Sequence, residues 1–180
     1  MSGTNRNSFF IDSHSPALVG PVAMPGVPPE AVAAFTQFSP KERAILFGFS
    51  WLTRLATEPG KRDWLVACDQ IQVAQNAGTI LTLVLHGKGN FDQFKQGRIV
   101  SLGPNNLKLM TVRKHPHAWE GPILALYPSE ALLNVIDAME GVTDVMVVPW
   151  QAMDKDGPVA AWTSKWSALP IIPQTRTNES

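Results

Sequence analysis

The segment with the clearest capacity for chemistry is His86-Gly87-Lys88-Gly89-Asn90, which follows an apolar run. Glycines let backbone N–H groups come close to an anion, and the lysine adds a positive charge beside them. A helix that begins directly after the segment adds the partial positive charge of its N-terminus. The segment therefore predicts a site for a small anionic ligand. The alternative is an ordinary strand-to-helix turn that carries a solvated lysine.

The known phosphate-binding motifs match this segment only in part. The G-x-x-x-x-G-K-[ST] pattern does not occur, and in the dinucleotide pattern Asp92 stands in place of the third glycine. His86 could act as a general acid or base near neutral pH, but it has no obvious carboxylate partner in the sequence. The catalytic residues of any reaction are unknown from the sequence, and so is any cofactor.

Other reactive side chains have more ordinary explanations. His115, His117 and Glu120 have a spacing that could ligate a metal, but a proline separates the histidines and no cysteine is near, so we predict no metal site. Ser129 lies where a helix needs a cap, and the G-x-S-x-G pattern of nucleophilic serines is absent around it. Cys68 is expected to be an inert core residue in the middle of a helix.

The segment 121–150 gives the strongest indication of the fold. Residues 123–127 and 145–148 are short apolar runs, which are typical of buried strands. Between them apolar residues recur at helical spacing, with Ser129 placed to cap the start of the helix and Gly141 to end it. The pattern predicts a βαβ unit.

Upstream of this unit we expect two helices and a strand. Ser39-Pro40-Lys41-Glu42 is a capping box that begins the first helix, and residues 63–77 form the second, so that the two make an αα-hairpin. Residues 79–85 are apolar and rich in β-branched side chains, which predicts a central strand. The remaining predicted elements are helices at 30–35, 91–96 and 158–167 and an edge hairpin with strands 98–102 and 107–113.

Together these elements predict an α/β fold. We expect a single compact domain with a mixed, mostly parallel sheet and flanking helices, an N-terminal αα-hairpin and a C-terminal βαβ unit. The predicted organisation is a flexible, proline-rich arm at 1–38, the α/β domain at 39–172 and a polar tail at 173–180. A length of 180 residues suits one such domain.

The predicted strands define where a ligand would bind. If the strands at 79–85, 123–127 and 145–148 are parallel, their carboxyl ends meet at one edge of the sheet, where open α/β sheets bind ligands. That edge would bring the aromatic residues Tyr127 and Trp150 beside the glycine-lysine segment. The predicted ligand-binding residues are His86, Gly87, Lys88, Gly89, Asn90, Tyr127 and Trp150.

Composition narrows the partners and the compartment. The formal net charge is zero, which argues against binding nucleic acid over the whole surface. A single cysteine permits no internal disulfide and favours a reducing compartment. No apolar run is long enough to span a membrane, and the first residues lack the apolar stretch of a secretory signal. These features predict a cytoplasmic protein without a membrane partner.

Three functions follow from these observations. We favour a non-catalytic binding or regulatory protein whose partner is an anionic small molecule or another protein, with self-association left open. One alternative is a small hydrolase or transferase that acts on a phosphorylated or nucleotide substrate near His86 and Lys88. The other is nucleic-acid binding through the basic segment 88–114, which the zero net charge disfavours.

Overall fold

The structure is a computed structural model that describes residues 6–11, 29–33, 37–149 and 157–171. Its centre is a seven-stranded sheet with the order β3-β4-β2-β5-β6-β1-β7. Every neighbouring pair is parallel except β3 and β4, which are antiparallel. The strands are β1 (Asn7–Phe10), β2 (Asp63–Cys68), β3 (Val100–Leu102), β4 (Asn105–Thr111), β5 (Ala118–Leu126), β6 (Glu140–Val148) and β7 (Leu169–Pro170). The predicted mixed, mostly parallel sheet in a single α/β domain is confirmed.

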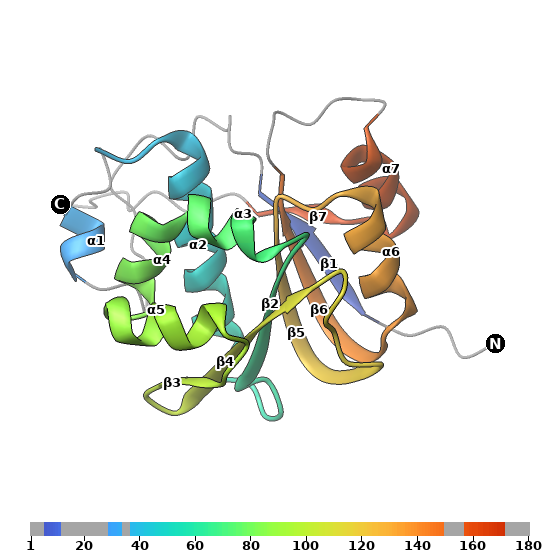
Figure 1. Ribbon diagram of the computed structural model, residues 1–180. Coiled ribbons are helices and arrows are strands. Elements are labelled where there is room, and N and C mark those ends of the chain that lie inside the picture. The colour runs from blue at the N-terminus through green and yellow to red at the C-terminus, as the bar shows by residue number, and fades with distance from the viewer. Residues whose placement is uncertain (1–5, 12–28, 34–36, 150–156, 172–180) are drawn as a thin grey trace, which may run out of the picture.

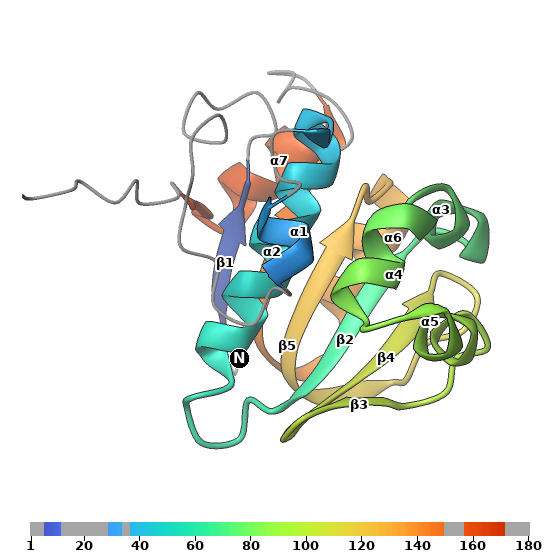
Figure 2. The same cartoon turned by 90° about the vertical axis from the view of Figure 1, so that its left-hand side faces the viewer.

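Helices cover both faces of this sheet (Figures 1 and 2). The first face carries α1 (Pro29–Ala33), α2 (Pro40–Leu55), α3 (Ile71–Asn76), α4 (Gly78–Val84) and α5 (Lys88–Lys95). The second face carries α6 (Glu130–Ala138) and α7 (Pro158–Lys165). Each face therefore has its own hydrophobic core, as is usual for a sheet with helices on both sides.

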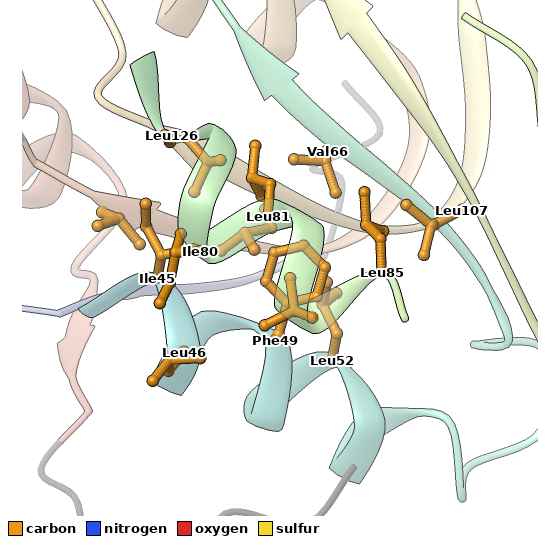
Figure 3. Close-up of a cluster of buried hydrophobic side chains, with 14 of the residues drawn as sticks. Ile45, Leu46, Phe49, Leu52, Val66, Ile80, Leu81, Leu85, Leu107 and Leu126 are labelled. Carbon is orange, nitrogen blue, oxygen red and sulfur yellow. The ribbon is translucent and has the colours of Figure 1, made fainter. Parts of the chain in front are cut away.

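The larger core lies between the sheet and helices α2 and α4 (Figure 3). Ser39 begins α2 as predicted, because its hydroxyl accepts a hydrogen bond from the Glu42 amide while the Glu42 carboxylate accepts one from the Ser39 amide. Gly48 brings α2 close to β5, since a Cβ at this position would lie 2.8 Å from Leu124 Cδ1. The side chains labelled in Figure 3 are Ile45, Leu46, Phe49, Leu52, Val66, Ile80, Leu81, Leu85, Leu107 and Leu126.

The predicted βαβ unit is confirmed as β5-α6-β6. The two strands are parallel, with Ile123 opposite Val145, and Ser129 caps α6 by accepting a hydrogen bond from the Leu132 amide. The role of Gly141 was predicted wrongly. Helix α6 ends at Ala138, and Gly141 lies inside β6 with a φ of 86°.

Two predicted elements on the first face are wrong. Residues 63–68 form strand β2, and only residues 71–76 of the predicted second helix are helical, so the predicted αα-hairpin does not form. Residues 79–85, predicted as a central strand, belong to helix α4 and its C-cap. An interior strand of the sheet is instead formed by β2, which lies between β4 and β5 with five consecutive buried residues.

The N-terminal boundary also needs correction. Strand β1 lies inside the sheet, between β6 and β7, and helix α1 precedes α2, so parts of the predicted arm belong to the domain. The helix predicted at 30–35 is α1, which spans 29–33. Residues 12–28 of the arm and the predicted tail at 173–180 lie outside the described residues.

The remaining predicted elements agree with the structure. β3 and β4 form the predicted hairpin at the edge of the sheet, joined by a two-residue turn of Gly103 and Pro104. A φ of 61° at Gly103 is the conformation that a type II′ hairpin turn requires at its first position. The predicted helices at 91–96 and 158–167 correspond to α5 and α7. Within the described ranges, no helix is long and apolar enough to cross a membrane.

Arg6 attaches β1 to the helices of the second face. Its guanidinium forms an ion pair with Asp137 of α6 at 2.6 Å and stacks 3.4 Å from the ring centroid of Trp166. Asp137 also accepts a hydrogen bond from Trp162 Nε1 at 3.1 Å and pairs with Lys165 at 2.9 Å. We call these five residues the Arg6 cluster. The side chain of Arg6 is only 3% exposed, so its positive charge is buried, whereas Lys165 lies at the exposed edge of the cluster.

A second buried charge lies in the middle of β6. Asp144 is 1% exposed and pairs with Lys61 at 3.1 Å. Its two oxygens also accept hydrogen bonds from Asn7 Nδ2 at 2.9 Å and Thr143 Oγ1 at 2.7 Å. Lys61 extends the network to the exposed Glu58 at 2.7 Å. These contacts compensate the carboxylate for its loss of water.

Candidate functional site

The chain turns in opposite directions after two neighbouring strands. After β2 it enters α3 on the first face, and after β5 it enters α6 on the second face (Figure 1). In open α/β sheets such a reversal creates a crevice beyond the carboxyl ends of the strands, where ligands bind. Asp69 follows β2 and Ser129 precedes α6, so both lie at this crevice.

Asp69 and Ser129 are joined by hydrogen bonds. Asp69 Oδ1 accepts one from Ser129 Oγ at 2.5 Å and one from the Ser129 amide at 3.2 Å. The carboxylate thus lies at the N-terminus of α6, where the helix dipole favours a negative charge. Both bonds use Oδ1, and no donor from the described part of the chain reaches Oδ2.

A cleft of about 800 Å³ opens beside this pair. Helix α3 and the two residues before it, Asp69 and Gln70, form one wall of the cleft. The turn after β4 forms the other wall, and the first turn of α6 closes the end. Most of the lining side chains are polar, and none is aromatic. The lining residues are Asp69, Gln70, Ile71, Gln72, Gln75, Thr111, Val112, Arg113, Ser129 and Ala131.

Arg113 supplies the positive charge of the cleft. It lies in a tight turn in which the amides of Thr111 and Lys114 each donate to the other's carbonyl, at 2.9 and 3.2 Å. Its side chain is exposed, and no carboxylate of the described residues pairs with it. The carboxylate of Asp69 already accepts two hydrogen bonds from Ser129 at the start of α6. The guanidinium of Arg113 has no carboxylate partner among the described residues and can therefore pair with a ligand.

The glycine-lysine segment lies at a helix-to-helix corner instead of a strand end. His86 and Gly87 connect α4 to α5, and Lys88, Gly89 and Asn90 are the first residues of α5. His86 has a φ of 61°, and it ends α4 in a Schellman motif. In this motif the Gly87 amide donates to the Thr82 carbonyl and the His86 amide to the Leu83 carbonyl. The ring of His86 makes no hydrogen bond within the described structure. The structural role of His86 at this corner therefore comes from its backbone conformation.

The other residues of this segment also have structural roles. Lys88 is 86% exposed and pairs with Asp92 at 3.6 Å. Asn90 donates a hydrogen bond to the Leu85 carbonyl at 2.7 Å, which satisfies the end of α4. A Cβ at Gly89 would meet nothing within 4 Å. The alternative interpretation, a tight turn with a solvated lysine, accounts for these contacts, and the ligand-binding role of the segment stays a prediction.

Tyr127 is not brought to that segment. It follows β5 with a φ of 51° and lines a separate cavity of about 230 Å³ with Thr79 at the start of α4. Burial raises the pKa of the Tyr127 hydroxyl above its usual value. The seven residues of α4 rise about 10 Å between this cavity and the corner at His86. Trp150 lies outside the described residues.

The sequence reasoning missed most residues of the cleft, including Asp69, Thr111 and Arg113. Asp69 was missed because residues 63–68 were predicted to be helical, which removed the strand that it follows. The available signal was a run of five residues without a charge or a break, Trp64 to Cys68, followed directly by Asp69 and Gln70. Arg113 was assigned to a strand, although the hairpin strand ends at Thr111.

The remaining reactive side chains lie elsewhere. His115 and His117 border a groove of about 280 Å³ beside α6, and the described residues contain no cluster of three or more metal-ligating side chains. Cys68 is buried in β2, and burial raises the pKa of its thiol to about 12, so the thiol stays protonated at neutral pH. In the basic segment, Lys88 and Lys95 both pair with Asp92 on α5.

Comparison with protein-family models, with curated proteins and with solved structures found no match for this chain. Its class therefore rests on its own architecture, which is an open α/β domain with a cleft at the carboxyl edge of the sheet.

Replacing His86 with glycine is expected to stabilise the protein. Because the left-handed conformation costs a residue with a Cβ more than it costs glycine, we expect a gain of about 0.5–1 kcal/mol. Urea unfolding measures this change in the free energy of unfolding. Gly87→Ala, at a φ of 126° in the same turn, is the matched control and should be destabilising. A loss of stability in His86→Gly would contradict the assigned role of the backbone.

Proposed function

We propose that this protein is a non-catalytic binding domain whose ligand is a small anionic molecule held in the cleft at the carboxyl edge of the sheet. The observation that carries the proposal is the position of the cleft, at the reversal between β2 and β5, with Arg113 free to pair with a ligand. A volume of about 800 Å³ is in the range of small-molecule sites.

The chemistry of the lining favours binding over catalysis. Ser129 Oγ donates to Asp69 and accepts from the Leu132 amide, so both roles of the hydroxyl serve the cap of α6. Neither histidine nor cysteine is among the side chains that line the cleft. A general base beside a free nucleophile, which hydrolase or transferase chemistry needs, is not part of this lining.

A thermal-shift screen with Arg113→Ala tests the proposal. A ligand at one hundred times its Kd stabilises the folded state by about 2.7 kcal/mol. For a domain of this size that corresponds to a rise in Tm of about 5–10 °C. We expect phosphorylated and carboxylated metabolites to produce such a rise in the wild-type protein, and Arg113→Ala to abolish most of it.

Lys88→Ala is the matched control, because it removes an exposed positive charge at the corner that was predicted from the sequence. The proposal requires the ligand effect to survive this substitution. If the ligand-induced rise in Tm is lost in Lys88→Ala and kept in Arg113→Ala, the ligand binds at the glycine-lysine segment and not in the cleft. If no anion shifts the Tm of the wild-type protein, the cleft is not an anion site.

Three further properties remain predictions. We expect cytoplasmic localisation, and we leave open a protein partner and self-association. Light scattering coupled to size-exclusion chromatography measures the molar mass in solution. A molar mass of one chain at all concentrations would exclude self-association. Nucleic-acid binding through segment 88–114 is disfavoured by the pairing of Lys88 and Lys95 with Asp92, and a steep salt dependence of any complex is its test.

A further inference from the structure

We propose that the ligand of this cleft is a phosphorylated polyol, such as a sugar phosphate. Its phosphate would pair with Arg113, and its hydroxyl groups would donate to Asp69. This inference rests on the proposed function and specifies the chemistry of its ligand. It follows from which charged and hydrogen-bonding groups of the cleft already have partners within the protein and which do not.

The first step concerns the place of the anionic group. The N-terminus of α6 attracts negative charge, but Asp69 already occupies it through the two hydrogen bonds from Ser129. A phosphate at that position would meet a like charge, which costs free energy. The guanidinium of Arg113, on the opposite wall, lacks a carboxylate partner within the described residues and can bind a phosphate with two parallel hydrogen bonds.

The second step concerns Asp69 itself. Oδ1 accepts both bonds from Ser129, whereas Oδ2 accepts none from the described residues. An ionised carboxylate only accepts hydrogen bonds, so Oδ2 selects a ligand that has donors. Hydroxyl groups are donors without a charge, and they can therefore satisfy Oδ2 on a molecule that is anionic elsewhere.

The third step concerns the rest of the lining. Gln70 and Gln75 make no side-chain hydrogen bonds among the described residues, and each offers an acceptor and two donors. Thr111 Oγ1 accepts a hydrogen bond from the Lys114 amide, which leaves its own proton to be donated. A polyol can use such a mixed set, because each of its hydroxyl groups both donates and accepts.

The fourth step excludes a nucleobase as the main recognised group. No aromatic side chain lines the cleft, so a base would have no ring on which to stack. Stacking on aromatic side chains contributes about 1–3 kcal/mol per base where it occurs. The sugar and phosphate parts of a ligand therefore have partners here, and a flat heterocycle does not.

Titration calorimetry with four probes tests the inference. The probes are ribose 5-phosphate, pentyl phosphate, inorganic phosphate and adenosine 5′-monophosphate. Pentyl phosphate has the charge of ribose 5-phosphate without the hydroxyl groups, so it isolates their contribution. Because a hydrogen bond to a charged group contributes about 1.5 kcal/mol or more, we expect ribose 5-phosphate to bind at least about tenfold more tightly than pentyl phosphate. Adenosine 5′-monophosphate should bind no more tightly than ribose 5-phosphate.

Two variants assign the ends of the ligand. Asp69→Asn keeps an oxygen for the bonds from Ser129 and removes the second acceptor, so it should weaken ribose 5-phosphate about tenfold and leave pentyl phosphate unchanged or tighter. Arg113→Ala should weaken both phosphates. Asp92→Asn, on α5, is the control and should change neither. The comparison of the two phosphates on the wild-type protein decides the question even if Asp69→Asn does not fold.

The outcomes separate this inference from the proposed function. Equal affinity for ribose 5-phosphate and pentyl phosphate, with both dependent on Arg113, would overturn the polyol and leave the anion site standing. Tighter binding of adenosine 5′-monophosphate by about tenfold or more would overturn the preference for a sugar over a base. If neither these probes nor any anion of the thermal-shift screen binds in a manner that depends on Arg113, both proposals fail.

Discussion

Replacing Arg6 with alanine is expected to lower the free energy of unfolding by about 3 kcal/mol, the low end of the range for breaking a buried ion pair. The side chain is 3% exposed, and it pairs with Asp137 while stacking on Trp166. Its loss leaves Asp137 buried with Lys165 and Trp162 as remaining partners, and it leaves a gap against the Trp166 ring. Urea unfolding at neutral pH measures the change.

Lys165→Ala is the matched control for this variant, because it breaks an ion pair with the same carboxylate. The side chain of Lys165 is 61% exposed, so its pair is expected to contribute less than about 1 kcal/mol. Equal losses in the two variants would contradict the dependence on burial. Arg6→Lys is expected to fall between them, because it keeps the charge and loses the planar stacking on Trp166.

The same cluster predicts a loss of stability in acid. Burial alone would raise the pKa of Asp137, but the ion pairs with Lys165 and Arg6 and the hydrogen bond from Trp162 outweigh it, so the pKa is lowered. The stabilisation is therefore complete above the pKa of the unfolded chain, about 3.9, and is lost as the pH falls through the lower pKa of the folded state. Acid titration of stability should be less steep below this pH in Asp137→Asn.

Replacing Lys61 with alanine is the second large effect, at about 3 kcal/mol, because it leaves the buried Asp144 carboxylate without its cation. Asn7 and Thr143 still donate to it, which keeps the cost below the upper end of the known range. Burial lowers the pKa of Lys61, and the bonds to Glu58 and Asp144 outweigh that effect and raise it. The contribution should therefore be fully present at neutral pH and be lost in alkali, as the pH rises through the raised pKa of Lys61 in the folded state.

Glu58→Ala tests whether burial is the cause. It removes the other carboxylate that pairs with Lys61, but this side chain is 54% exposed, so we expect a loss of less than about 1 kcal/mol. Urea unfolding of both variants under the same conditions gives the comparison. If Lys61→Ala and Glu58→Ala lower the free energy of unfolding by similar amounts, the buried pair with Asp144 contributes no more than the exposed pair with Glu58.

The elements that the sequence predicts well are those with local signals. The capping box at Ser39 and the cap at Ser129 give the starts of α2 and α6. The loop residues at 103–106 give the edge hairpin, although only Gly103 and Pro104 form its turn and the next two residues belong to β4. Each of these signals is a hydrogen bond or a backbone conformation that neighbouring residues can satisfy by themselves, so no knowledge of the tertiary structure is needed.

The two errors that affect the site concern short apolar runs of five and seven residues. Residues 79–85 have the β-branched composition of a strand, yet they are helical because only one side is buried, with Ile80, Leu81 and Val84 facing the core. Residues 64–68 are buried on both faces of the sheet, and they belong to β2, an interior strand. Short apolar runs do not reveal their period, and tertiary packing decides between the two structures.

The errors carried over to the site because a strand end defines it. With residues 79–85 taken as a strand, the glycine-lysine segment was placed at the carboxyl edge of the sheet. With β2 as the strand, Asp69 takes that place. The sequence predicts a site at the carboxyl ends of parallel strands, with β5 among them, and the cleft lies at that edge once β2 is recognised as the neighbour of β5.

The position of β1 has a consequence for the order in which the protein assembles during synthesis. Asn7 of β1 contacts Asp144 of β6, which lies 137 residues later in the chain. A ribosome that adds about 5–20 residues per second needs roughly 7–30 s to make the segment between them. During this time the first strand has no partner, and chaperones or proteases can reach it. Strand β1 can take its place between β6 and β7 only after both of these strands have been synthesised.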